Sequence, residues 1–114
     1  MLAGRWRIVE MDVWDREALD LVGPAFIEFT GDGDGEFLFV AVSGWLDCRP
    51  AEREGRPGVE FSWDGDDEGQ RTNGRGWAAW SEDQSIHGHI FIHQGDDSAF
   101  LARPYDVECV EEER

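Results

Sequence analysis

The chain has 114 residues, with 26 Asp and Glu against 10 basic residues and a formal net charge of −16 at pH 7. This length corresponds to one domain with one core, and a hydrophobic content of 40% is typical of a folded rather than a disordered protein. So negative a chain is repelled by phosphate backbones and anionic lipid, which argues against nucleic acid and membranes as partners.

The hydropathy of the chain and the spacing of its cysteines predict its location and its redox state. No apolar run is long enough to cross a bilayer, and residues 1–10 lack the apolar segment of a signal peptide. We therefore expect a cytoplasmic protein. Cys48 and Cys109 lie outside any C-x-x-C spacing, so two free thiols are expected in a reducing compartment, with a disulfide between them as the alternative.

The first part of the chain predicts a strand followed by a short helix. Residues 5–11 alternate, with Trp6 and Ile8 on one face. Asp12 is predicted to cap the helix, because its carboxylate can accept hydrogen bonds from the free amides of the first turn. The helix is expected to end at Gly23-Pro24. The residues on its apolar stripe are Trp14, Ala18, Leu21 and Val22.

The middle of the chain predicts further strands. Residues 25–30 form one, and the Gly- and Asp-rich segment 31–36 turns the chain back. Residues 37–42 are apolar on both faces and predict the next strand. Gly44 interrupts the pattern before residues 45–49, which are either a new strand or the continuation of a bent one.

The second half of the chain contains the clearest strand, residues 59–63, after a polar turn at 52–57. Residues 64–75 carry no apolar side chain and predict a mobile loop. Three strands follow, at residues 77–81, 86–93 and 98–103. Residues 1–104 are predicted to form the domain, and residues 105–114 an acidic C-terminal tail.

Some seven or eight short strands, without alternating long helices, predict a mostly β fold. We expect an antiparallel up-and-down meander that closes into a small barrel, with a sandwich as the alternative. About eight strands leave an interior that side chains fill or that holds one small ligand. The side chains expected to point inward are bulky, so a narrow pocket or a packed core is predicted. They are Trp6, Ile27, Phe29, Phe61 and Trp63.

Two segments at opposite ends of the domain carry a resemblance. Gly4 precedes Trp6 by two positions on the first strand, and Arg103 lies on the last strand. This pattern resembles the signature of the calycin barrels, which include lipocalins, fatty-acid-binding proteins and avidins. The resemblance implies that Arg103 lies across Trp6 and closes the end of the barrel. The chain is shorter than most lipocalins and has one helix where fatty-acid-binding proteins have two; it also resembles small uncharacterised prokaryotic proteins.

The histidines are the most chemically suggestive residues. His87, His89 and His93 fall on one face of a predicted strand, and His87 and His89 are close enough to share a metal such as zinc. The interpretation we favour places the isoleucines of this strand inward and the histidines outward, with no metal or other cofactor. There is no nucleophile or phosphate-loop motif, so an enzyme is not the favoured interpretation.

Three hypotheses for function follow. The first is a small-molecule binding protein whose narrow pocket is lined by aromatic and polar residues. The second is an acidic interaction module with a filled core that docks a basic protein partner. The third is a metal-dependent enzyme that uses the histidines. The residues expected to line the pocket are Trp45, Trp63, Trp77, Trp80, Arg49 and His93.

Overall fold

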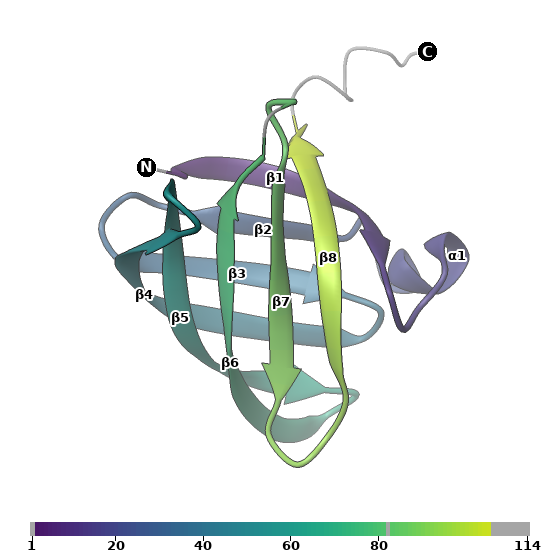
Figure 1. Cartoon of the computed structure of the whole chain (residues 1–114). Helices are drawn as coiled ribbons and strands as arrows, with labels where there is room; N and C mark the ends of the chain where they lie inside the picture. Colours follow the sequence, from purple (N-terminus) through teal and green to yellow (C-terminus); the bar gives the residue numbers. More distant parts are fainter. Residues whose placement is uncertain (1, 82, 106–114) are drawn as a thin grey trace.

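The structure is a computed structural model that describes residues 2–81 and 83–105. Eight antiparallel strands form a closed barrel, in which each strand pairs with the next in sequence and the last pairs with the first. Figure 1 shows the barrel with one short helix beside its wall. The predicted up-and-down barrel with a helix after the first strand is confirmed. Cys109 and residues 106–114 of the predicted tail lie outside the described residues.

The elements follow one another in chain order, and the helix stands between the first two strands. They are β1 (Gly4–Met11), α1 (Arg16–Leu19), β2 (Phe26–Phe29), β3 (Asp34–Phe39), β4 (Val42–Arg53), β5 (Arg56–Asp67), β6 (Gln70–Trp80), β7 (Ile86–Ile92) and β8 (Asp97–Pro104).

Aromatic side chains fill the inside of the barrel. The five bulky residues predicted to point inward are each at most 5% exposed. Phe37 and Trp63 meet edge to face with ring centroids 4.9 Å apart, and Trp6 meets Trp80 in the same way at 5.4 Å. Such contacts are favourable beyond the burial of the rings. The core is therefore built from rings that reach across the barrel.

Inward-facing glycines make room for these rings. A Cβ atom at Gly44 would lie 2.8 Å from Phe37 Cζ and 2.8 Å from Trp63 Cε3. A Cβ atom at Gly76 would lie 2.5 Å from Phe61 Cζ. Real side-chain atoms cannot approach so closely, so each ring lies directly against the backbone of a glycine on a neighbouring strand.

The turn between β3 and β4 corrects the prediction for residues 37–42. The chain reverses at Val40 and Ala41, and Val40 has a φ of 56°. Its backbone N–H donates to the carbonyl of Leu19 at 2.8 Å, which ties the turn to α1. Gly44 does not interrupt a strand, because β4 continues through it to Arg53.

The prediction of a loop at residues 64–75 is wrong. β5 runs on to Asp67 and pairs with β6, which begins at Gln70. Gly65 and Gly74 occupy inward positions of this hairpin in place of apolar residues, and Trp63 covers Gly74. A Cβ atom at Gly74 would lie 2.8 Å from Trp63 Nε1, and this indole N–H donates to the carbonyl of Phe91 at 3.2 Å. The Trp63 ring thus provides the apolar cover that an alternating apolar sequence would otherwise give to Gly74.

The helix is one turn long and begins later than predicted. Asp15, not Asp12, is its N-cap, and its carboxylate accepts from the Ala18 amide at 2.9 Å. The backbone N–H of Asp12 is instead bonded to β8, where the Ser98 hydroxyl accepts it at 3.0 Å. Leu19 is the buried residue of the turn, whereas Leu21, expected on the apolar stripe, is 64% exposed.

The first and last strands meet, as the calycin resemblance implies. β1 begins at Gly4, whose φ of 126° favours glycine. Trp6 points inward, and its indole N–H donates to the carbonyl of Leu2 at 3.0 Å. Arg103 lies on the outer face with 53% of its side chain exposed, and its guanidinium is 4.0 Å from the Asp83 carboxylate. The resemblance implies that Arg103 lies across Trp6, whereas in the structure its guanidinium lies beside the Asp83 carboxylate.

Candidate functional site

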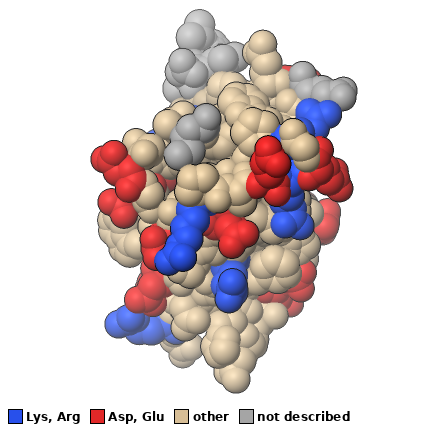
Figure 2. Space-filling model, turned by 60° about the vertical axis from the view of Figure 1, so that its left-hand side comes forward, with Lys and Arg blue, Asp and Glu red and all other residues tan. Residues whose placement is uncertain are grey.

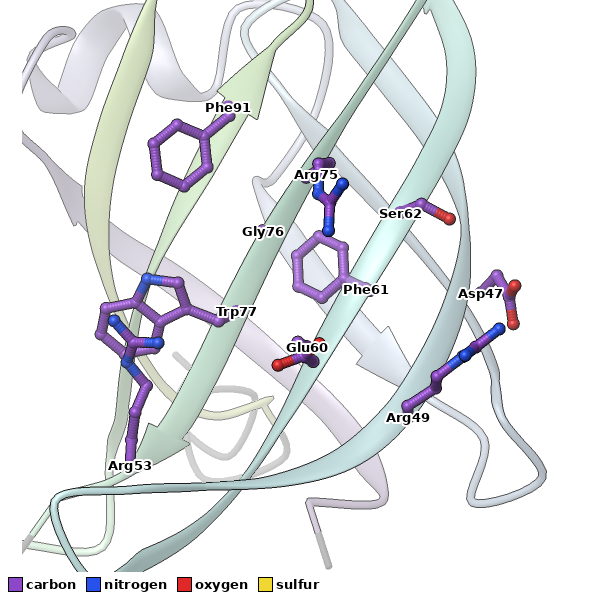
Figure 3. Close-up of a pocket in the computed structure, with 10 residues that line it drawn as sticks. All are labelled: Asp47, Arg49, Arg53, Glu60, Phe61, Ser62, Arg75, Gly76, Trp77 and Phe91. Atoms are coloured by element: carbon purple, nitrogen blue, oxygen red, sulfur yellow. The ribbon is translucent and has the colours of Figure 1, made fainter.

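One candidate site is a groove on the outer face of the barrel, where β4, β5, β6 and β7 lie side by side. It encloses about 630 Å³, which is in the range of small-molecule sites. Figure 3 shows its side chains coming from these four strands. We call it the arginine groove, after the three arginines that line it: Arg49, Arg53 and Arg75.

Strand register explains how distant residues come together in the groove. Residues that face one another across paired strands form rows, and successive outward residues of a strand are two positions apart, so neighbouring rows lie side by side. The groove contains two such rows. They are Asp47–Ser62–Arg75–Phe91 and Arg49–Glu60–Trp77.

Among residues 2–81 and 83–105, no ion pair includes Arg49, Arg53 or Arg75. Figure 2 shows basic side chains gathered among acidic ones on the side of the barrel that carries β4 and β5. Elsewhere in the molecule arginines do pair with carboxylates. These pairs are Arg5–Glu28, Arg7–Asp20, Arg71–Asp64 and Arg103–Asp83.

Two aromatic rings form the apolar part of the groove. The Arg53 guanidinium lies over the Trp77 ring, 3.7 Å from its centroid (Figure 3). Phe91 is 42% exposed and stacks on His89, with ring centroids 4.5 Å apart. His89 is held in turn by Asp97, whose carboxylate oxygen lies 2.5 Å from Nε2. The groove therefore offers flat apolar surfaces beside the guanidinium groups of Arg49 and Arg75, which pair with no carboxylate of the described residues.

The residues predicted to line a pocket are divided between three regions. Arg49 and Trp77 lie in the arginine groove. Trp63 is 3% exposed and belongs to the core, and Trp80 packs against that core from inside the barrel. Trp45 lies on the outer face, 70% exposed.

His93 is exposed beyond the end of β7, and its backbone N–H donates to the carbonyl of Asn73 at 2.7 Å. The other two histidines point outward from β7, as the favoured interpretation predicts, and the ring of each already has a partner. His87 Nδ1 lies 2.7 Å from the Ser81 hydroxyl, and His89 is bonded to Asp97. Within the described part of the chain, no three His, Cys, Asp or Glu residues are placed to hold a metal ion.

Sequence reasoning missed Arg53, Arg75, Phe91 and Glu60. A usable signal was the run Gly74-Arg75-Gly76-Trp77, in which small and large residues alternate with a period of two. Such a run is compatible with a strand whose glycines point inward and whose large residues point outward. Because the prediction assigns residues 64–75 to a loop, it places Arg75 on no face of a strand.

Comparison with models of protein families, with curated proteins and with solved structures gives no match for this chain. In the described ranges, no helix has both the length and the apolar character needed to cross a membrane. Inferences about function therefore depend on the geometry of the barrel itself.

Proposed function

We propose that the protein is a ligand-binding barrel that holds a small molecule in the arginine groove. The ligand would carry an anionic group and a flat apolar group. One observation carries the proposal: three arginines that form no ion pair with the described residues lie beside Trp77 and Phe91, in a chain that has a large excess of carboxylates. In so acidic a chain, the absence of ion pairs to these arginines within the described ranges favours an external anion.

The chemistry of the lining supports this ligand class. A guanidinium is planar and binds phosphate or carboxylate through two parallel hydrogen bonds. Trp77 and Phe91 provide surfaces for an aromatic ring, which prefers offset or edge-to-face contact. Glu60 lies opposite Arg49 and Trp77 in register and can accept a hydrogen bond from an N–H or O–H group on the ligand.

The outer face, and not the interior, is where the proposal places the ligand. The inside of the barrel is occupied by packed rings, including Trp6, Trp63 and Phe37. A relationship to the calycins belongs to the proposal, supported by barrel closure and by Trp6 at the start of β1. A cytoplasmic location also belongs to it, supported by the free thiol of Cys48, which suits a reducing compartment.

The proposal is tested by calorimetric titration with 1-naphthyl phosphate, alongside 1-naphthol and inorganic phosphate. Only the first probe has both the ring and the anion, so it is expected to bind more tightly than either part. We expect Arg75→Gln and Arg49→Gln each to weaken binding about tenfold, since a hydrogen bond between charged groups contributes about 1.5–3 kcal/mol.

Arg71→Gln is the matched control. Arg71 is on β6, as is Arg75, but it is 82% exposed and pairs with Asp64 outside the groove. This variant should bind the probe within about twofold of the unmodified protein, because an exposed ion pair contributes little. If Arg71→Gln weakens binding as much as Arg75→Gln, or if neither variant changes it, the groove is not the site.

A further inference from the structure

A second surface lies on the outer face, where β2, β3 and β4 meet. It surrounds Trp45 and contains a shallow groove of about 260 Å³. Register places Glu36 opposite Trp45 on one side and Asp64 opposite it on the other. We call this surface the tryptophan strip and define it by Glu28, Asp34, Glu36, Trp45 and Asp64.

Trp45 is bare, whereas the other tryptophans are covered. Each of the five others contacts an aromatic ring or a guanidinium. The contacts are Trp6–Trp80, Trp14–Phe39, Trp63–Phe37 and Trp77–Arg53. No ring or guanidinium of the described chain lies against Trp45, which is 70% exposed. So exposed a ring is available to contact another molecule, and tryptophan is enriched among the residues that contribute most to binding at interfaces.

Carboxylates oppose one another across the strands beside Trp45. Glu28 faces Glu36, and Asp34 faces Asp47. Like charges placed directly opposite each other destabilise a sheet. Arg5 neutralises Glu28 at 3.0 Å, but no ion pair within the described ranges includes Asp34, Glu36 or Asp47. A cation bound here would remove a repulsion that the free protein retains.

We propose that the tryptophan strip docks an arginine-bearing segment of a basic protein partner. One guanidinium would lie over the Trp45 ring, and Glu36 and Asp34 would bind its edge. A cation over a tryptophan ring is attracted by the ring's electron density, and carboxylates hold a guanidinium through paired hydrogen bonds. The net charge of −16 adds long-range attraction for such a partner. The inference is independent of the ligand proposed for the arginine groove.

The test uses an acetylated, amidated peptide of eight residues in which arginine and glycine alternate, and a copy with citrulline in place of arginine. Binding is followed by nuclear magnetic resonance through the six tryptophan indole N–H signals. We expect the arginine peptide to move the Trp45 signal and amides of β2 to β4, and the citrulline peptide to move neither. Trp45→Ala and Glu36→Gln should each weaken binding by about fivefold, and Trp45→Phe should restore part of the loss.

Two controls separate this contact from general acidic attraction. Glu54→Gln removes the same charge as Glu36→Gln, but from the β4–β5 turn, outside the strip. Phe91→Ala removes an exposed ring from the arginine groove. Both variants should bind the peptide within about twofold of the unmodified protein. The proposal is overturned if Glu54→Gln weakens binding as much as Glu36→Gln, or if Trp45→Ala binds normally. It is also overturned if sedimentation shows that Trp45→Ala abolishes a dimer of the chain, since the strip would then join two copies.

Discussion

The arginine groove and the tryptophan strip share strands β4 and β5 and differ in charge. Trp45, Asp47 and Arg49 are successive outward residues of β4, so the chemistry of the surface changes within about 13 Å at about 3.3 Å per residue. In the groove, Trp77 is covered by an arginine of its own chain. In the strip, Trp45 is bare and carboxylates surround it. The comparison shows that neighbouring outward positions can differ in charge and in aromatic cover, because the core depends only on the inward ones.

The largest expected effect concerns the part of β4 where the groove and the strip meet. Cys48 lies there, between Asp47 and Arg49. Burial, together with the nearby carboxylates of Asp47 and Asp34, raises the pKa of the thiol from 9.0 to about 11. At pH 8 the thiolate fraction in the folded protein should therefore be about 100-fold smaller than in the unfolded chain. Iodoacetamide labelling of Cys48, followed by peptide mapping, should keep accelerating up to about pH 10.5 when folded, and should level off above about pH 9 in urea.

The raised pKa of Cys48 also makes the stability of the protein depend on pH. Since the folded-state pKa of Cys48 lies above the unfolded value, its contribution to stability is present below pH 9 and is lost as pH rises through about 11. Asp47→Asn should lower the pKa of the thiol more than Asp34→Asn. If both variants leave the labelling profile unchanged, the negative potential at the boundary is not what raises this pKa.

The next effect concerns the glycines beneath the two surfaces. Gly76 lies under the arginine groove and Gly44 beside Trp45, and a methyl group at either position would meet an aromatic ring. We expect Gly76→Ala and Gly44→Ala each to lower the free energy of unfolding by about 1–3 kcal/mol, the usual cost of overpacking. Denaturant unfolding measures the loss. Gly23→Ala is the control, since its added methyl would meet only Leu38 Cδ2 at 3.8 Å, and it should change stability by less than about 0.5 kcal/mol. If Gly76→Ala is stable and Gly44→Ala is not, the packing beneath the arginine groove is looser than the packing beside Trp45.

The fold could be predicted where inward residues are apolar. Val59, Phe61 and Trp63 alternate with polar residues, and all three are buried in β5. The prediction failed at Gly74, because its apolar cover comes from a ring on another strand. Trp63 lies against the backbone of Gly74 on β6. A contact of this kind depends on the register between strands, which no single segment of sequence contains.

The dependence on strand register also limited the prediction of the candidate site. Arg49 and Trp77 were predicted to line a pocket, and they do lie in one groove. Phe91 and Arg75 could not be added, since they join the groove only because β7 places Phe91 opposite Arg75 on β6. The expected barrel predicted a narrow ligand pocket, whereas the groove lies on the outer face of the barrel. Of the four tryptophans assigned to that pocket, Trp63 belongs to the core and Trp80 packs against it.

The smallest effect is expected where the two tryptophans differ most. Arg53→Gln removes the guanidinium that lies 3.7 Å from the Trp77 ring and leaves Trp77 in contact with the edge of the His87 ring, with centroids 5.5 Å apart. Stability should fall by about 0.5–1 kcal/mol, the value of an exposed cation over a ring, and acrylamide should quench tryptophan emission more strongly. Arg49→Gln makes the same change of charge in the same groove without a ring contact, so it should alter neither quantity. Equal losses in both variants would mean that charge alone, and not the cover over Trp77, distinguishes the groove from the strip.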